Sequence, residues 1–359
     1  METGSGLYWG IECVSGGPDQ SPGRTRPGGV GSSRRKAICT WTNCSGTFWL
    51  VDVYCNWFGG WMTDRFAVTS VRMPYPLPVG GGLPTRTIAF VEVNGCVAEI
   101  SPLPGLHTES LEESLCDLKT GALKTPTAQF AHSVLMAQGR QDAWVKGDVN
   151  RPLPRMNGLV AGAVDDLVSH EVIKVKIGRK PNEDVQRLQT VLRQSPNCRL
   201  RLDGNRLLTL DQVLDVVGSI PLDRIEYVEE PLIDSTQLPE LAKVVPVALD
   251  ESLHDPAASR HADASGTWFH VIKPTRLGSI SSLVQEVELA QSMDREVVLT
   301  SCFESPWTLG VLCRIAESLG LHKAQGLGTA DLFQGWPAVN VTSDLSEVDM
   351  PSLDWKPWI

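Results

Sequence analysis

A regular alternation of strand-like and helix-like segments, running from about residue 157 toward the C-terminus, constrains the fold of this chain more than any other feature. Apolar runs rich in β-branched residues predict strands at 172–177, 199–202, 225–228, 245–249, 270–272 and 296–300. Helix-start residues follow three of these runs, namely Pro181, Thr209 and Pro306. Such alternation predicts a parallel sheet with helices outside it, and about seven repeats favour a closed barrel of the TIM type over a doubly wound sheet.

The stretch 62–155 has a different pattern and predicts a smaller α+β unit. Two strand-like runs are present, and the second ends at Asn94-Gly95, which predicts a type I′ hairpin turn. A helix is expected to begin at Thr108, and a second helix to span about 126–139.

Residues 1–61 differ in composition from the remainder of the chain, because they hold five of the eleven Trp and four of the nine Cys residues. Residues 1–33 are rich in Gly, Pro, Ser and Arg without a hydrophobic period, so they are not expected to fold alone. The apolar patch at 46–61 contains Asp52 and is followed by no small-residue cleavage site, which argues against a signal peptide. The cysteines of this region match no zinc-binding spacing. We therefore expect 1–61 to be an extension outside the fold.

The overall composition excludes several classes of protein. A hydrophobic share of 42% is enough for a sizeable core, and the net charge of −10 argues against a dedicated nucleic-acid binder. No apolar run reaches the length of a membrane span, so no membrane association is expected. The cysteines are odd in number and scattered, and Cys198, Cys302 and Cys313 fall in apolar runs, which predicts a reducing, cytoplasmic location. No pattern in the sequence sets an oligomeric state.

Charged residues stand at the ends of five successive predicted strands. They are Lys174 with Lys176, then Asp203, Glu229, Asp250 and Lys273, at intervals of 21 to 27 residues counted from Lys176. A single acid after a strand is more often a helix cap or a loop residue. Because the carboxyl ends of barrel strands converge on one face, where barrel enzymes place their chemistry, five in series instead predict a site.

Three carboxylates held together would repel one another unless a cation neutralises them. Ligands that are all oxygen suit a hard ion, and the absence of histidine from the set Asp203, Glu229 and Asp250 disfavours zinc. The set therefore predicts Mg²⁺, for which Mn²⁺ can substitute, and a small anionic carboxylate as substrate. The neighbouring lysines either neutralise the acids or act as bases, since a nearby cation lowers the pKa of an amine.

These residues resemble the enolase superfamily. The matching motifs are Lys174-Val175-Lys176, Leu202-Asp203-Gly204-Asn205, Val228-Glu229-Glu230-Pro231, Leu249-Asp250-Glu251-Ser252 and Ile272-Lys273-Pro274. Within it the chain is most similar to the o-succinylbenzoate synthase family, through the segments 98–105, 273–278, 300–305 and 326–329. Each tripeptide alone is weak support, whereas five in the right order at barrel spacing are strong. The similarity runs from about Met62 to Phe333.

The resemblance implies a (β/α)7β barrel of the TIM type with an α+β capping domain. It divides the chain into the extension 1–61, the capping domain 62–155 and the catalytic barrel 156–334, with 335–359 packing back on the capping domain. The loop that closes over the substrate in this superfamily comes from the capping domain, and here 79–84 is short and Gly-rich.

The resemblance also implies roles for individual residues. Asp203, Glu229 and Asp250 would be the Mg²⁺ ligands. Lys176 would be the acid/base catalyst oriented by Lys174, and Lys273 would face the opposite side of the substrate. Lesser roles are implied for four residues: substrate contact for Thr300 and Ser301, and support of the ligands for Asn205 and Glu251.

By this resemblance the activity is the Mg²⁺-dependent dehydration of 2-succinyl-6-hydroxy-2,4-cyclohexadiene-1-carboxylate to o-succinylbenzoate, through an enediolate, in menaquinone or phylloquinone synthesis. An N-succinylamino acid racemase or related epimerase is the alternative, because racemisation uses the same metal triad and both lysines as bases. A non-catalytic metal-binding or interaction protein, with the Trp- and Cys-rich region 1–61 as its interface, is an alternative of another class.

Overall fold

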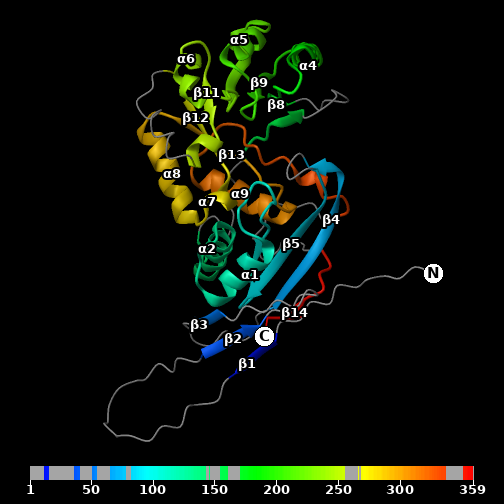
Figure 1. Cartoon of the computed structure of the whole chain (residues 1–359), viewed down its shortest axis with the longest axis vertical. Helices are drawn as coiled ribbons and strands as arrows, with labels where there is room; N and C mark the ends of the chain where they lie inside the picture. The colour runs from blue at the N-terminus through cyan, green and yellow to red at the C-terminus, as the bar shows by residue number, and fades with distance from the viewer. Residues whose placement is uncertain are drawn as a thin grey trace, which may run out of the picture.

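The computed structural model describes residues 12–15, 36–40, 51–54, 65–77, 82–142, 145, 154–160, 170–254, 266, 268–336 and 351–358 (Figure 1). Within these residues the strands form three sheets: one of three strands, one of four and one of seven. The four-stranded and seven-stranded sheets correspond to the two sequence patterns that follow residue 62.

The four-stranded sheet is antiparallel and belongs to the smaller α+β unit. Its order is β14-β4-β5-β6, and the strands are β4 (Arg65–Leu77), β5 (Leu83–Val93), β6 (Cys96–Ile100) and β14 (Lys356–Pro357). Asn94 and Gly95 adopt φ values of 50° and 76°, as the predicted type I′ turn between β5 and β6 requires. The predicted loop 79–84 lies partly outside the described residues.

Helices α1 (Leu111–Thr120) and α2 (Pro126–Arg140) pack against β6. The predicted start of α1 at Thr108 is wrong, because the N-cap is Ser110. The Ser110 hydroxyl accepts the N–H of Glu113 at 3.1 Å, and the Glu113 carboxylate accepts the N–H of Ser110 at 2.7 Å. This reciprocal capping box needs a Glu three residues after the cap, a condition that Ser110 meets.

The seven-stranded sheet is parallel throughout and runs in sequence order from β7 to β13. Its strands are β7 (Gly158–Val160), β8 (Val172–Lys176), β9 (Arg199–Asp203), β10 (Ile225–Glu229), β11 (Val247–Leu249), β12 (Trp268–Ile272) and β13 (Glu296–Leu299). The register pairs Lys176 with Asp203, and Asp203 with Glu229. The ends of β8, β9 and β10 are therefore level with one another.

A short segment at 324–326 joins the two edges of this sheet. Gly326 bridges to Thr300 beside β13, and Gln325 bridges to Met156 just before β7, both in parallel orientation. The Gly326 N–H donates to the Leu299 carbonyl at 2.8 Å, which ties the segment to β13. The sheet thus closes on itself through an eighth extended segment, which confirms the predicted barrel.

Helices follow most of the barrel strands and cover the outside of the sheet (Figure 1). They are α4 (Pro181–Gln194), α5 (Leu210–Gly218), α6 (Leu238–Leu241), α7 (Pro274–Leu277), α8 (Ile280–Ser292) and α9 (Pro306–Ser318). Short 3-10 turns supplement them: η1 (Leu222–Arg224), η2 (Ser235–Gln237), η3 (Glu251–His254) and η5 (Ala330–Leu332). Thr209 and Gln212 form the predicted capping box of α5.

The barrel interior contains a small apolar cluster beneath the strand ends. It consists of Tyr227, Ala248, Phe269, Val271 and Val298. Because side chains alternate along a strand, Glu229 lies on the same face of β10 as Tyr227 and projects above this cluster. The acids at the strand ends therefore lie above buried apolar side chains.

The N-terminal strands β1 (Glu12–Ser15), β2 (Lys36–Thr40) and β3 (Val51–Tyr54) pair only with one another within the described strands, in an antiparallel sheet that the sequence pattern did not predict. At the other end of the chain, β14 pairs with β4, and the ring of Trp358 lies 6.3 Å from that of Phe66. The domain division stays a prediction.

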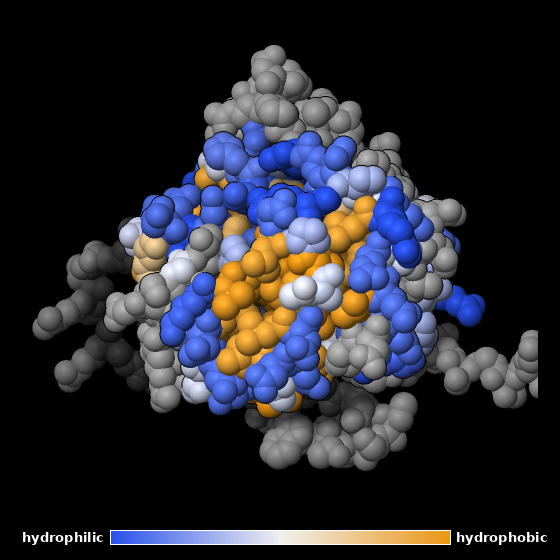
Figure 2. All heavy atoms as spheres, turned by 90° about the horizontal axis from the view of Figure 1, so that it is seen from above, coloured by the Kyte–Doolittle hydropathy of each residue, from blue (hydrophilic) through white to orange (hydrophobic). Residues whose placement is uncertain are grey.

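The surface around α4, α5 and α6 carries apolar side chains framed by hydrophilic ones (Figure 2). Large exposed apolar residues of the described chain include Leu207, Leu222 and Ile233. No helix among the described residues has the length and apolar character needed to cross a membrane.

Candidate active site

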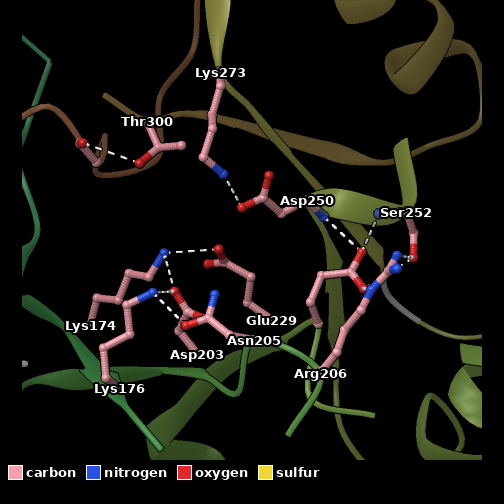
Figure 3. A network of polar contacts seen from close by, with 12 residues as sticks. Lys174, Lys176, Asp203, Asn205, Arg206, Glu229, Asp250, Ser252, Lys273 and Thr300 are labelled. Atoms are coloured by element: carbon pink, nitrogen blue, oxygen red, sulfur yellow. Dashed lines mark hydrogen bonds and ion pairs between the residues drawn. The ribbon is translucent and has the colours of Figure 1, made fainter. Parts of the chain in front are cut away.

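The structure brings the six predicted charged residues together at the carboxyl ends of β8 to β12 (Figure 3). Lys174 and Lys176 come from β8, and the carboxylates of Asp203 and Glu229 from the last residues of β9 and β10. Asp250 directly follows β11, and Lys273 directly follows β12. The alternation of strands and helices in the sequence predicts that these residues lie on one face of the barrel, and the structure places them there.

The two lysines of β8 contact one side of the carboxylate cluster. Lys174 Nζ lies 2.7 Å from Asp203 Oδ2 and 2.8 Å from Glu229 Oε1. Lys176 Nζ lies 2.6 Å from the same Asp203 oxygen and donates to Asn205 Oδ1 at 2.8 Å. Asn205, predicted to support the ligands, therefore contacts the predicted catalyst directly.

Lys273 approaches the cluster from the other side and forms an ion pair with Asp250 (Figure 3). Its side chain is 12% exposed, against 32% for Lys176. Lys176 is thus the more accessible of these two ammonium groups, and the carboxylates lie between them.

The acids at the centre are almost completely buried, and their pKa values respond in different ways. Burial raises the pKa of Glu229 to about 7, the negative charge of Asp203 adds to this, and Lys174 acts against it. Burial also acts to raise the pKa of Asp203, but the ammonium groups of Lys174 and Lys176 outweigh it and hold that pKa below its ordinary value. Burial and the neighbouring charge of Asp203 therefore disfavour the ionised form of Glu229, and a further cation would oppose both effects.

The pKa values of Lys174 and Lys273 are raised above the ordinary lysine value. Burial acts to lower both, but Asp203 and Glu229 outweigh it at Lys174, and Asp250 does so at Lys273. Both groups are therefore ammonium ions when the carboxylates have no other cation as partner.

The residues present fit a hard divalent cation. Asp203 Oδ1, Glu229 Oε2 and Asp250 Oδ1 are buried and have no hydrogen-bond partner among the described residues. Buried carboxylate oxygens without partners are costly, and a divalent ion would satisfy them. As the side chains stand, no group of three or more His, Cys, Asp or Glu residues in the described chain is arranged around a common ion position. The other oxygen of each carboxylate pairs with a lysine ammonium group, so a bound ion would share the three carboxylates with these lysines.

Comparison with known proteins places this geometry in a family. Residues 158–330 match the family model described as enolase C-terminal domain-like. The o-succinylbenzoate synthase of Escherichia coli (strain K12) is 30% identical over 284 residues, covering 71% of this chain and 86% of the relative. That of Haemophilus influenzae is 28% identical over 288 residues, covering 71% of this chain and 84% of the relative. The chain belongs to the o-succinylbenzoate synthase family of the enolase superfamily.

A solved structure agrees with this family in fold. The o-succinylbenzoate synthase of Thermosynechococcus elongatus, complexed with Mg in its active site, has a TM-score of 0.59 and 23% identity. The match covers 79% of this chain and 97% of that one. Membership of the o-succinylbenzoate synthase family makes the chain an enzyme, a lyase, and sets aside the non-catalytic interpretation.

The remaining residues predicted from the resemblance to the o-succinylbenzoate synthase family follow the ends of β11 and β13. Thr300 lies on the Lys273 side of the site (Figure 3), and its hydroxyl donates to the Gly326 carbonyl at 3.4 Å. The Ser301 hydroxyl is 2.9 Å from that of Thr329. Burial and the charge of Asp250 raise the pKa of Glu251, whose Oε2 is buried and has no hydrogen-bond partner among the described residues.

One buried acid at the site had no predicted role. Glu230 belongs to the superfamily motif Val228-Glu229-Glu230-Pro231, but its position directly after a strand is equally typical of an ordinary loop acid. The structure buries it to 1% exposure. The available signal was a second acid directly after the strand-end acid Glu229, together with Arg206, which stands directly after Gly204-Asn205 in the turn that follows β9. Only the contacts show what it does.

Proposed function

We propose that the chain dehydrates 2-succinyl-6-hydroxy-2,4-cyclohexadiene-1-carboxylate to o-succinylbenzoate in an Mg²⁺-dependent reaction of menaquinone or phylloquinone synthesis. The observation that carries the proposal is the placement of Lys176 and Lys273 on opposite sides of three buried carboxylates, each with one oxygen that has no hydrogen-bond partner among the described residues. The similarity to curated o-succinylbenzoate synthases supports it. We also propose a cytoplasmic location, which the buried thiols of Cys198, Cys302 and Cys313 support.

Asp203, Glu229 and Asp250 would hold the ion, because their free oxygens are carboxylate donors in a buried setting. When bound, Mg²⁺ supplies positive charge that stabilises the negative charge developing on the substrate carboxylate. The substrate is therefore expected to be a small anionic carboxylate that shares the site with the ion. The burial of the three carboxylates strengthens each electrostatic contact that they make.

Lys176 would be the acid/base catalyst. In its neutral form it takes the α-proton of the substrate, and the C–H electron pair moves into the enediolate. The ammonium group so formed returns a proton to the departing hydroxyl, the C–O bond breaks, and water leaves. One lysine on one face is sufficient for this sequence, and Asn205 keeps its Nζ directed into the site at 2.8 Å.

The two other lysines would act without taking the proton. Lys174 is held between Asp203 and Glu229, so it balances their charge and limits where Lys176 can lie. Lys273 would present a cation to the opposite face of the planar intermediate and stabilise its negative charge.

A racemase or epimerase acting on N-succinylamino acids is the second candidate. The same observation favours it, because lysines on opposite sides of the cluster could each exchange a proton with one face of an α-carbon (Figure 3). The two functions differ in what is asked of Lys273: a stationary cation for dehydration, and a second base for racemisation.

The test is an assay of the purified full-length chain with the cyclohexadiene substrate and with N-succinyl amino acids, in Mg²⁺ and in EDTA. Lys176→Ala should lower the rate of o-succinylbenzoate formation by about 10²–10⁴-fold, the range typical for loss of a general base. Lys180→Ala is the matched control, because that lysine is 68% exposed and pairs with Glu183 at the surface. Undiminished turnover by Lys176→Ala would overturn the assignment, and turnover of N-succinyl amino acids alone would select the second candidate.

A further inference from the structure

A buried carboxylate directly behind the proposed metal ligands accepts hydrogen bonds from two neighbouring loops. Glu230 Oε1 accepts the backbone N–H of Asp250 at 3.0 Å and that of Ser252 at 2.7 Å. Its Oε2 accepts Arg206 Nε–H at 3.0 Å and the Ser252 hydroxyl at 3.0 Å. Four donors fill the acceptor sites of an ionised carboxylate, so the arrangement leaves Glu230 little freedom to move.

These contacts connect three consecutive strand ends. Arg206 belongs to the turn after β9, Glu230 follows β10, and Asp250 and Ser252 follow β11. The backbone adds two further links: the Arg206 N–H donates to the Glu230 carbonyl at 2.6 Å, and the Glu230 N–H donates to the Ala248 carbonyl at 3.1 Å. Arg206 Nη2 also donates to the Ser252 hydroxyl at 2.8 Å, which closes the network (Figure 3).

The backbone around this network is strained. Asn205, Arg206 and Glu230 have φ values of 44°, 58° and 37°, in the left-handed region that side-chain-bearing residues seldom adopt. Such a conformation costs folding free energy and persists only where surrounding contacts hold it. Because the strained Asn205 is the residue that accepts from Lys176, the network reaches one lysine through Asn205 and the other through Asp250, the partner of Lys273.

We propose that Glu230, acting with Arg206 and Ser252, is a positioning residue that holds the Asp250 and Asn205 turns at the separation the reaction needs. It touches neither substrate nor ion. It fixes the backbone of the ligand Asp250 from one side and the turn that aims Lys176 from the other. This inference rests on the proposed function, because it takes Asp250 as a ligand and Lys176 as the catalyst.

The test replaces the carboxylate by an amide of the same shape. In Glu230→Gln one oxygen becomes an NH₂ group, which must face either the two backbone N–H groups or Arg206 Nε–H with the Ser252 hydroxyl, and of these only the hydroxyl can accept. The Asp250 turn should shift, so Mg²⁺ binding without substrate, measured by titration calorimetry, should weaken about 10–100-fold, the usual effect of losing a partner behind a metal ligand. The Mg²⁺ concentration for half-maximal turnover should rise by the same factor.

A buried carboxylate elsewhere in the chain is the control that distinguishes a positioning role of Glu230 from a purely structural one. Asp117 accepts the N–H groups of Lys124 and Thr125 at 2.5 and 2.6 Å and the Thr125 hydroxyl at 2.9 Å, in the α1–α2 region far from the barrel site in sequence. Asp117→Asn should lower the melting temperature as Glu230→Gln does, while its Mg²⁺ affinity stays within about twofold of wild type.

Arg206→Met and the double variant test whether the network acts as one unit. Arg206→Met alone should weaken Mg²⁺ binding severalfold, and the double variant should be no worse than Glu230→Gln, since both act through one contact set. Losses that multiply instead would contradict the network. If Glu230→Gln does not fold, Ser252→Ala, which removes one hydroxyl, should still weaken Mg²⁺ binding about threefold.

Wild-type-like Mg²⁺ affinity in a folded Glu230→Gln, with only its melting temperature lowered, would overturn the inference. Failure of the proposed function has a different outcome: no turnover of the cyclohexadiene substrate by the wild-type protein. In that case the ratio of Mg²⁺ affinities still decides the role of Glu230.

Discussion

Replacing Glu229 by Gln should stabilise the metal-free protein at neutral and alkaline pH, although it removes a proposed ligand. Glu229 has a folded-state pKa of about 7 against 4.5 for an ordinary Glu, because it is buried next to Asp203. The folded protein therefore binds this proton more tightly than the unfolded chain. Protonated Glu229 contributes stability at low pH. This contribution is lost as the pH rises from the pKa of Glu229 in the unfolded chain through its pKa in the folded protein.

The size of the effect follows from the two pKa values. At about 1.36 kcal/mol for each pH unit between them, full ionisation of Glu229 costs the folded, metal-free protein roughly 3 kcal/mol. Most of that cost appears between about pH 5 and about pH 8, where it amounts to roughly 2–3 kcal/mol. Other groups titrate in this range, but wild type and Glu229→Gln share them, so their contributions cancel in the difference.

The assay is urea unfolding of both proteins in EDTA at about pH 5 and about pH 8, followed by tryptophan fluorescence. The free energy of unfolding of Glu229→Gln relative to wild type should increase by roughly 2–3 kcal/mol between the lower and the higher pH. With Mg²⁺ at about 100 times its dissociation constant, wild type alone should gain about 2.7 kcal/mol. If the unfolding free energies of wild type and Glu229→Gln change in parallel with pH in EDTA, the raised pKa of Glu229 is refuted.

Four further predictions concern other parts of the chain. Burial lowers the pKa of His107 to about 4, so wild-type stability should fall as pH drops from about 6.5 toward 4, and His107→Asn should flatten this dependence in urea titrations; an unchanged slope would contradict it. Glu99 caps the N-terminus of α9 from β6, so Glu99→Gln should lower the unfolding free energy by about 1–3 kcal/mol, and a neutral result would show that the cap contributes nothing. A Cβ on Gly204 would lie 2.6 Å from Pro231 Cα, so Gly204→Ala should cost about 1–3 kcal/mol and lower turnover by displacing the Asn205 turn; a wild-type melting curve would disprove the contact. Deleting 1–61 should leave lyase activity within about twofold, and loss of folding would show that this region belongs to the fold.

Much of the barrel was predictable because its signals are local. A β-branched run followed by a helix start depends on neighbouring residues only, so the strands β8 to β13 and the caps of α5 and α9 lie close to their predicted positions. The start of α1 failed for a local reason too. Thr108 and Ser110 are both acceptable caps, and the deciding factor was whether the Glu side chain could reach back to the cap N–H.

The contacts of the site were less predictable than its members. The positions of Asp203, Glu229 and Asp250 follow from strand spacing, but the sequence does not say which lysine pairs with which acid. In the structure Lys174 bridges Asp203 and Glu229, while Lys273 pairs with Asp250. The pairing of lysines with acids depends on which strands are adjacent in the closed sheet and on how far below the strand end each side chain is attached.

By itself the sequence determined the alternating architecture, the face on which the charges gather and the chemical type of the site, because all three follow from residue type and spacing along the chain. Only the tertiary structure decided how the sheet closes through 324–326, since its bridges to Met156 and Thr300 depend on the curvature of the whole sheet. It also decided the role of Glu230. At a φ of 37° its side chain departs from the strand alternation, so no periodicity could show that it reaches back to Asp250 and Ser252.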